Sequence, residues 1–326
     1  MPLRLVHYLD HSDDSKPEVG FLADEGAVGF TRLAEACSEV KSGCDCPDCW
    51  ESPLGIAICP ACLEAARSYA AWFAKQDAAT RTGLALARDR VKLLPPVAKP
   101  GKVFCLAQNF PEHAAESNRH ITRAGDSIAD EMAPHVFLKP TTNTICGDGD
   151  PILITPTAQF MDYEAEVCLV IGKAGKYIET SEAAEYIAAV TCMNDVSERS
   201  LKIWERKDER EWDRFFDWLN GKWMDNSAPI GPCLVPAADL DIDHLTVRCF
   251  VNDELRQEGN TADMYHSAAQ TVSYISQMLT LEPGDLIALG TPAGVGKARG
   301  LKLVPGDVVQ IEVEGVGVLR NPVVGE

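Results

Sequence analysis

The segment Asp162–Gly172 reads DYEAEVCLVIG, and the organisation of the chain is easiest to derive from it. The residues after Glu166 are apolar and rich in β-branched side chains, which predicts a buried strand ending at Gly172. Residues two apart on a strand share a face, so Glu164 and Glu166 point the same way. Two such carboxylates repel each other unless a cation or a proton joins them. The segment predicts a strand that starts at a cation site, although E-x-E spacing alone also fits a solvated strand face.

Asp195 is a third candidate ligand for the same cation. It ends another strand-like stretch, AAVTCMND over 188–195, and a neighbouring strand would bring its carboxylate to the glutamate pair. Three carboxylates with open positions for water suit Mg²⁺ or Mn²⁺, and a donor set made of oxygens alone argues against zinc.

The sequence around these stretches predicts a mostly β domain over 102–326, with helices on its outside. Its other strand-like stretches are KVFCLA, HVFLKP, LTVRCFVND, DLIALG, VVQIEVEG and VGVLRN. Helical segments are expected at 200–217, which is charged with embedded aromatic residues, and at 266–279, which is amphipathic. A short helix is expected to begin near Pro111, before a loop over 118–134.

Residues 1–92 predict a small N-terminal β/α domain. Short apolar runs alternate with Gly and Asp over 1–32, which is typical of two or three strands. Residues 33–92 look helical and contain a cysteine-rich insertion at 44–62. The proline-rich stretch LLPPVAKPGK predicts a linker over 93–101. We therefore expect an α+β chain with one small and one large unit.

Composition narrows the class of protein. Apolar residues form 46% of the 326 residues, enough for a sizeable core, and the formal net charge is −19. An acidic surface without a basic patch argues against nucleic-acid binding. No apolar run approaches the roughly 20 residues of a membrane span. The N-terminal stretch MPLRLVHYLDHSDDSK lacks the apolar core of a secretory signal, so we expect a cytoplasmic protein without a membrane or nucleic-acid partner.

Three further segments carry groups suited to acid–base chemistry and anion binding. His113 and Glu116 lie three apart on the expected helix, and a carboxylate that orients an imidazole makes it an effective general base for water. Lys222, in NGKW, is a candidate cation for a carboxylate or an oxyanion. The stretch GTPAGVG, from Gly290 onward, permits close backbone approach to a ligand. From spacing alone, a solvated helix face, a surface lysine and a plain turn remain open alternatives.

The ordered set of motifs resembles the fumarylacetoacetate hydrolase family from about Lys102 to the C-terminus. The motifs are NFPEHAAE, FLKPTT, DYEAEVCLVIGK, NDVSER, GPCLV, VNDELRQEGNT, YISQMLTLEPGD, GTPAGVG and GDVVQIEVEGVG. The resemblance implies a mixed β-sheet roll with peripheral helices, usually paired into a homodimer, with Mg²⁺ or Mn²⁺ at its mouth. It also implies the residue roles, which are metal ligation by Glu164, Glu166 and Asp195, catalysis by His113, Glu116 and Lys222, and substrate binding by Arg199, Gly290 and Thr291.

The resemblance implies a small 2-oxo or 1,3-dioxo acid as substrate. We expect hydrolysis of a C–C bond in an acylpyruvate-like β-diketo acid, of the fumarylpyruvate or maleylpyruvate type, in aromatic-compound catabolism. The alternative is a decarboxylase, or an isomerase or hydratase, acting on a 2-oxo dicarboxylic acid through the same enolate. Lys202 stands where the family often has glutamine, and we expect it to bind a second substrate carboxylate. Residues 200–218 are expected to form either a lid or a helix packed on the sheet.

The cysteines fall into two groups. Six lie singly in apolar stretches and are expected to be buried thiols, namely Cys105, Cys146, Cys168, Cys192, Cys233 and Cys249. The insertion, outside the region of resemblance, contains two C-P-x-C turns, Cys46 to Cys49 and Cys59 to Cys62. Such paired turns are typical of a structural Zn²⁺ site, with local disulfides and uncoordinated thiols as the alternatives.

Overall fold

The computed structural model describes residues 2–40, 47–117 and 133–326, and in them strands predominate with helices at the periphery. The strands are β1 (Leu5–Asp10), β2 (Asp13–Ala23), β3 (Gly26–Gly29), β4 (Val91–Leu93), β5 (Val103–Ala107), β6 (His135–Lys139), β7 (Ile145–Cys146), β8 (Ile152–Ile154), β9 (Met161–Asp162), β10 (Ala165–Ile171), β11 (Ile187–Asn194), β12 (Ser197–Glu198), β13 (Ala228–Pro236), β14 (Thr246–Val251), β15 (Glu254–Asn260), β16 (Leu286–Ala288), β17 (Val308–Val313) and β18 (Gly317–Gly325). The helices are α1 (Phe30–Ala36), α2 (Pro53–Ile58), α3 (Pro60–Ala74), α4 (Ala78–Leu84), α5 (Pro111–Ser117), α6 (Asp213–Asn220), α7 (Ala268–Met278) and α8 (Gly296–Arg299). None of these helices is long and apolar enough to cross a membrane.

The first sheet has eleven strands and curls on itself. Its path runs β3-β2-β1-β13-β11-β10-β16-β5-β6, with β4 beside β1 and β7 beside β13. Only residues 140–144 connect β6, at the end of the path, to β7, which pairs with β13, and four strands lie between β13 and β6 along the path. The sheet must therefore curl until its β6 end approaches β13, which forms the predicted roll. The prediction of mixed sheets with peripheral helices is confirmed.

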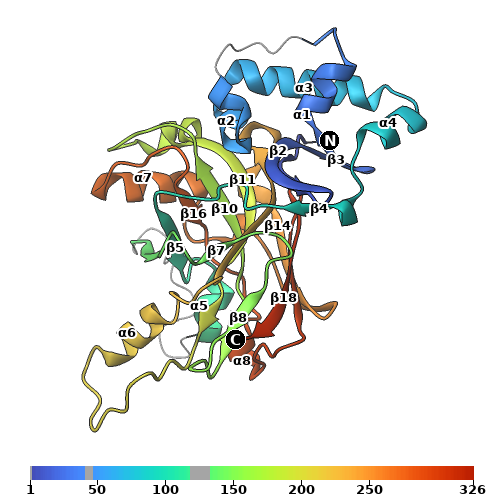
Figure 1. Cartoon of the computed structure of the whole chain (residues 1–326). Coiled ribbons are helices and arrows are strands. Elements are labelled where there is room, and N and C mark those ends of the chain that lie inside the picture. Colours follow the sequence, from blue (N-terminus) through green and yellow to red (C-terminus); the bar gives the residue numbers. More distant parts are fainter. Residues whose placement is uncertain (1, 41–46, 118–132) are drawn as a thin grey trace.

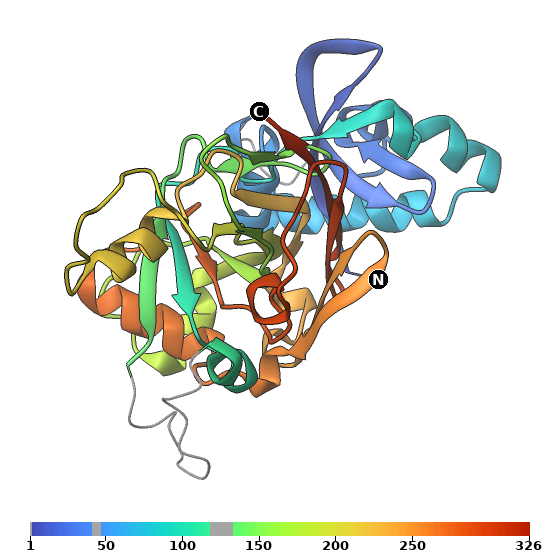
Figure 2. The ribbon, with the colours of Figure 1, turned by 90° about the horizontal axis from the view of Figure 1, so that it is seen from below.

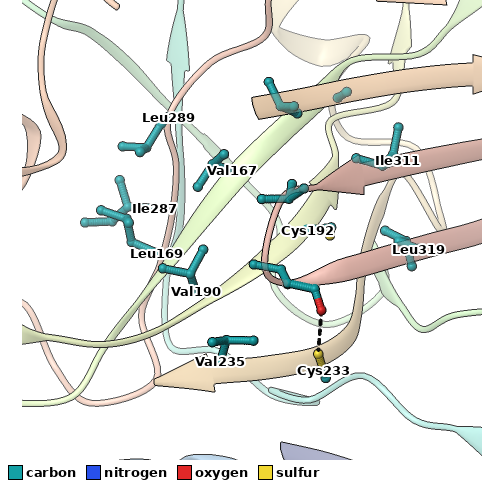
Figure 3. Close-up of a cluster of buried hydrophobic side chains, with 14 of the residues drawn as sticks. Val167, Leu169, Val190, Cys192, Cys233, Val235, Ile287, Leu289, Ile311 and Leu319 are labelled. Atoms are coloured by element: carbon teal, nitrogen blue, oxygen red, sulfur yellow. Dashed lines mark hydrogen bonds between the residues drawn. The ribbon is translucent and has the colours of Figure 1, made fainter. Parts of the chain in front are cut away.

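A second sheet, with the order β15-β14-β17-β18-β8, packs against one face of the first. Alternate residues of β10, such as Val167 and Leu169, point into the shared core and meet Ile311 and Leu319 of the second sheet, as Figure 3 shows. Burial of each such side chain stabilises the fold by roughly 1.5–3 kcal/mol. The cysteines predicted to be buried are buried, and Cys233 of this core donates its S–H to the Val316 carbonyl at 3.4 Å.

The N-terminal residues are joined to this roll through a strand and a helical layer. β1 pairs antiparallel with β13, with Leu5 opposite Leu234, so the N-terminal strands extend the large sheet. The fully buried Ile56 of α2 and Tyr69 of α3 lie in one apolar cluster with Val170 and Met193 of the large sheet. Figure 1 shows α1–α4 gathered at one end of the molecule, with α5 and α6 toward the other.

One predicted helix is shorter than expected. The charged stretch from 200 becomes α-helical only at Asp213, and 203–212 contains turns and bends. Arginine side chains of this stretch pair with acids of the following helix, as when Arg210 contacts Asp213, the first residue of α6, at 2.8 Å. The helix at 268–278 agrees with prediction, because Ser267 and Gln270 form a capping box at its start. Most of the loop expected over 118–134 lies outside the described residues.

Candidate active site

Three buried carboxylates meet where β10 begins and β11 ends. The two strands pair antiparallel with Glu166 opposite Met193, which puts Asp195, just past β11, beside Glu164, just before β10. The Asp195 backbone N–H donates to the Glu164 carbonyl at 2.9 Å. Oxygens of Glu164, Glu166 and Asp195 lie within 4.8 Å of one another. The structure thus brings the three predicted ligands together.

Two buried lysines contact this acidic triad. Lys222 Nζ donates to Glu164 Oε2 at 2.6 Å and to Asp195 Oδ2 at 2.7 Å. Lys139, at the end of β6, donates to Asp195 Oδ1 at 2.7 Å. Burial acts to lower the pKa of Lys222, but the charges of Asp195 and Glu164 outweigh it and raise that pKa to about 12. Lys222 therefore remains a charged ammonium group inside the cluster.

Arg199 completes the positive side of the cluster. Its Nε donates to Asp162 Oδ2 at 3.0 Å, and its NH2 group donates to Glu164 Oε1. Burial acts to raise the pKa of Glu164, but Arg199 and Lys222 outweigh it and hold that pKa well below its usual range. The triad and Asp162 carry four carboxylates against the three cations Lys139, Lys222 and Arg199. One carboxyl group is therefore left without a cationic partner.

The carboxylate without a cationic partner is Glu166, which pairs with no lysine or arginine in the described part of the chain. Burial and the charges of Asp195 and Glu164 raise its pKa well above the usual range. The backbone N–H of Gly290 donates to Glu166 Oε2 at 2.8 Å. Gly290 has φ +96°, and a Cβ there would lie 2.9 Å from the Asn109 side chain. Only glycine fits this approach without displacing a neighbour.

His113 and Glu116 form the predicted pair on α5. His113 Nδ1 lies 2.9 Å from Glu116 Oε1, and the same carboxylate accepts the Gly294 backbone N–H at 2.9 Å through Oε2. Burial acts to raise the pKa of Glu116, but the hydrogen bonds from His113 and Gly294 outweigh it and lower that pKa. An ionised Glu116 therefore orients the imidazole with Nδ1 engaged and Nε2 available.

Five of the polar residues described above line one cavity of about 870 Å³. Its polar wall includes His113, Glu116, Glu164, Arg199, Lys222, Thr291 and Lys297, and its apolar wall includes Leu106, Val136, Phe137, Phe215, Trp218, Tyr274 and Met278. Figure 2 shows the helices that carry much of this lining, α5, α6 and α7, on one side of the molecule. A small acid bound here would lie between the imidazole and the cluster of charges.

Some predicted residues take other positions than expected. Lys202 does not line the cavity; its side chain is 55% exposed and pairs with Glu205 at 3.2 Å, because the preceding Leu201 is the residue that turns inward. Thr291 lines the cavity and accepts a hydrogen bond from Gln257 at 2.8 Å. In the stretch expected as a lid or a packed helix, Phe215 and Trp218 line the cavity while Trp204 is exposed.

Two residues that contribute to the charged cluster were not among the candidates chosen from the sequence. Lys139 lies in the predicted strand HVFLKP and was given no role, although it shares a strand face with the buried Phe137, and a lysine on a buried face was the available signal. Asp162 was also given no role, yet its carboxylate accepts the backbone N–H groups of Gly296 at 2.7 Å and Lys297 at 3.0 Å. It orients Arg199 toward the triad.

The donor set fits a divalent cation. The three candidate ligands offer only oxygen atoms, which suits Mg²⁺ or Mn²⁺. The Lys222 ammonium between two of the carboxylates indicates that the cluster attracts positive charge. With the four carboxylates ionised around it, a divalent ion would give the cluster one net positive charge, and that balance suits an anionic substrate.

A curled mixed sheet with a buried acidic triad and a histidine–glutamate pair in one cavity defines an enzyme that acts on a small acid. The family model described as fumarylacetoacetate (FAA) hydrolase C-terminal matches residues 102–324. The chain therefore belongs to the fumarylacetoacetate hydrolase family, as its motifs predicted.

Three relatives show the range within this family. A mitochondrial oxaloacetate tautomerase of Bos taurus is 37% identical over 242 residues, covering 73% of this chain and 71% of that protein. The crystal structure of a 5-carboxymethyl-2-hydroxymuconate delta-isomerase from Mycobacterium smegmatis has 33% identity and a TM-score of 0.59, covering 73% of this chain and 83% of that one. A fumarylacetoacetate hydrolase structure from Exiguobacterium antarcticum has 25% identity and a TM-score of 0.71, covering 99% and 100%.

Proposed function

We propose that this enzyme is a tautomerase or isomerase that moves a proton on a 2-oxo dicarboxylic acid. The observation that carries the proposal is that the His113–Glu116 pair lines the same cavity as Glu164 of the triad and the cations Arg199 and Lys222. In the reaction, a proton leaves the carbon next to the 2-oxo group, and the carbonyl oxygen gains a proton to give the enol. No water is consumed and the carbon skeleton is unchanged.

Each polar group would have one task. Glu164, Glu166 and Asp195 would hold Mg²⁺ or Mn²⁺, which when bound supplies Lewis-acid stabilisation of negative charge on the substrate oxygens. His113 Nε2 would take the proton from carbon while Glu116 holds Nδ1. Lys222 and Arg199 would balance the charge that develops near the triad, and Thr291 would contact the substrate as part of the cavity wall.

The relatives favour proton transfer over the C–C hydrolysis that we first expected. The tautomerase of Bos taurus and the isomerase of Mycobacterium smegmatis are 37% and 33% identical to this chain, whereas the hydrolase of Exiguobacterium antarcticum is 25% identical. The same imidazole could instead activate water, so hydrolysis is the competing outcome that the test must separate.

The second carboxylate of the substrate needs a cation on the cavity wall. Lys297 lines the cavity, and its Nζ lies 3.2 Å from Ser200 Oγ and 4.8 Å from the Phe160 ring centroid. We assign the second carboxylate to Lys297, since Lys202 points away. We also propose that the enzyme is a homodimer, as its family resemblance implies, which light scattering of the purified protein would test.

The test follows product structure as well as rate. Purified enzyme with Mg²⁺ or Mn²⁺ is given enol-oxaloacetate, fumarylpyruvate, maleylpyruvate and acetylpyruvate, with ultraviolet absorbance and NMR as readouts. We expect enol–keto interconversion of oxaloacetate above the buffer rate, with all four carbons retained and with loss of activity in EDTA. Pyruvate released faster than tautomerisation would establish a hydrolase or decarboxylase and overturn the proposal.

A further inference from the structure

Three cysteines of the N-terminal insertion lie close together in space. Their positions in the sequence are far before those of the acidic triad. Cys49 lies in the 3₁₀ turn η1 (Pro47–Trp50), Cys59 lies between α2 and α3, and Cys62 lies in the first turn of α3. Their sulfur atoms lie within 4.8 Å of one another. Chain segments ten residues apart therefore converge on one group of sulfur atoms.

The local backbone favours thiolates at this place. Cys59 is the N-cap residue of the 15-residue helix α3, and Pro60 occupies its first turn. The N-terminus of a helix stabilises negative charge, so two of the three sulfurs lie where a thiolate is favoured. Cys62 is fully buried, and buried thiolates need a cation beside them. Sulfur separations within 4.8 Å are compatible with a metal site, since sulfur ligands about 2.3 Å from a tetrahedral Zn²⁺ are about 3.8 Å apart.

We propose that Cys49, Cys59 and Cys62 bind a structural Zn²⁺ that is independent of the active-site cation. Thiolate ligands select zinc, whereas the oxygen triad selects a harder ion, so the two sites differ in chemistry. The sequence predicts Cys46 as a fourth ligand, but Cys46 lies outside the described residues. The proposal rests on the three thiols that the structure describes.

The metal would secure short elements that cannot be stable alone. η1 has 4 residues and α2 has 6, well below the length at which a helix persists in isolation. Trp50, next to Cys49, packs against the ring of Phe30 at 5.2 Å, and Ile56 of α2 is fully buried in the cluster beneath the large sheet. A zinc ion at Cys49 and Cys62 would tie η1 and α2 to the long helix α3 and so fix this packing.

The test measures zinc directly in the full-length protein. We expect one zinc per chain by mass spectrometry of metals after purification without chelator, and stoichiometric zinc release when a mercurial reagent modifies the thiols. Cys49→Ser and Cys62→Ser should each lose zinc and show a lower Tm. Cys37→Ala is the matched control, a buried cysteine of the same region outside the group, and it should keep its zinc.

Two further measurements keep the result clear if a cysteine variant fails to fold. X-ray absorption of the wild-type protein should show zinc–sulfur distances with three or four sulfur ligands. Glu166→Gln should retain the zinc, because the proposed zinc site does not use the oxygen triad. Wild-type protein without zinc, with these thiols either titratable or in disulfides, would overturn the proposal, as would zinc that Glu166→Gln removes.

Discussion

His113 Nδ1 lies 2.9 Å from Glu116 Oε1 on α5, and both residues line the cavity that Glu164 of the acidic triad also lines. This contact fixes one nitrogen of the imidazole and leaves the other for the substrate. The backbone N–H of Gly294 holds the carboxylate from its other side. The pair is therefore positioned by the loop after β16 as well as by its own helix.

Loss of the Glu116 carboxylate should slow proton transfer without abolishing substrate binding. Glu116→Gln keeps an oxygen that can accept a backbone N–H but loses the charge that orients the imidazole. General acid–base catalysis contributes typically 10²–10⁴-fold, so we expect kcat to fall by about 10²-fold with KM changed less than threefold. His113→Ala should lower kcat by a further factor of about 10. Unchanged kcat in either variant would remove the pair from the mechanism.

The same carboxylate predicts a pH dependence of stability. The pKa of Glu116 is lowered in the folded state, so its ionised form stabilises the fold above its ordinary value of 4.5, and this contribution is lost as pH falls through the folded-state pKa. We expect Glu116→Gln to lower the free energy of unfolding by about 1–2 kcal/mol at pH 7. The difference from wild type should shrink below pH 4.5. Urea unfolding at both pH values measures it, and an equal difference at both would contradict the assignment.

Much of this site follows from strand periodicity and helix spacing. Glu164 and Glu166 share a face because residues two apart on a strand do so, and His113 meets Glu116 because residues three apart on a helix do so. Lys139 could not be found in this way. Its contact with Asp195 depends on the curl that brings β6 toward β13, and no local pattern encodes that long-range closure.

Lys202, which its position in a family motif placed near the substrate, does not line the cavity. An exposed stretch without regular structure at 203–212 lets the chain turn it outward. Lys297 of α8 lines the cavity beside Ser200. We propose it as the partner of the second carboxylate, and motif position alone could not indicate it, because α8 lies far from Lys202 in the sequence.

Lys297→Gln should change substrate preference. Its backbone N–H, which donates to Asp162, is unaffected, so the loop should keep its structure. A charge-assisted hydrogen bond contributes about 1.5–3 kcal/mol, so we expect KM for oxaloacetate to rise about tenfold or more while monocarboxylic 2-oxo acids are unaffected. Lys202→Gln is the matched control and should leave both values unchanged. The opposite pattern would restore Lys202 as the recognition residue.

Glu166→Gln should separate metal binding from folding. Glu166 lies beside Glu164 and Asp195 without a cation of its own, and its raised pKa favours the neutral form when no metal is bound, so the neutral glutamine costs the metal-free protein nothing in charge. We expect the variant in EDTA to be as stable as wild type or more stable. A metal present at 100 times its Kd stabilises by about 2.7 kcal/mol, and this gain should appear in wild type and disappear in the variant. Thermal unfolding of both proteins with and without Mn²⁺ tests both expectations. An equal rise in Tm on adding Mn²⁺ to the two proteins would exclude Glu166 as a ligand.

Gly294→Ala should affect both stability and catalysis. Gly294 has φ +105°, and an added Cβ would lie 2.2 Å from the Arg256 carbonyl oxygen, so the loop would have to move. That movement would pull its N–H away from Glu116. We expect a loss of about 3 kcal/mol or more in the free energy of unfolding, together with a kcat close to that of Glu116→Gln.

Gly300 provides the matched comparison for that loop. It also has a positive φ, +70°, but nothing lies within 4 Å of the position that its Cβ would take. Gly300→Ala should therefore cost only the left-handed backbone penalty of about 1–2 kcal/mol and leave kcat unchanged. Equal losses in the two variants would mean that backbone conformation alone matters at Gly294. A larger loss at Gly294, accompanied by the fall in kcat, would show that the loop holds the catalytic carboxylate in place.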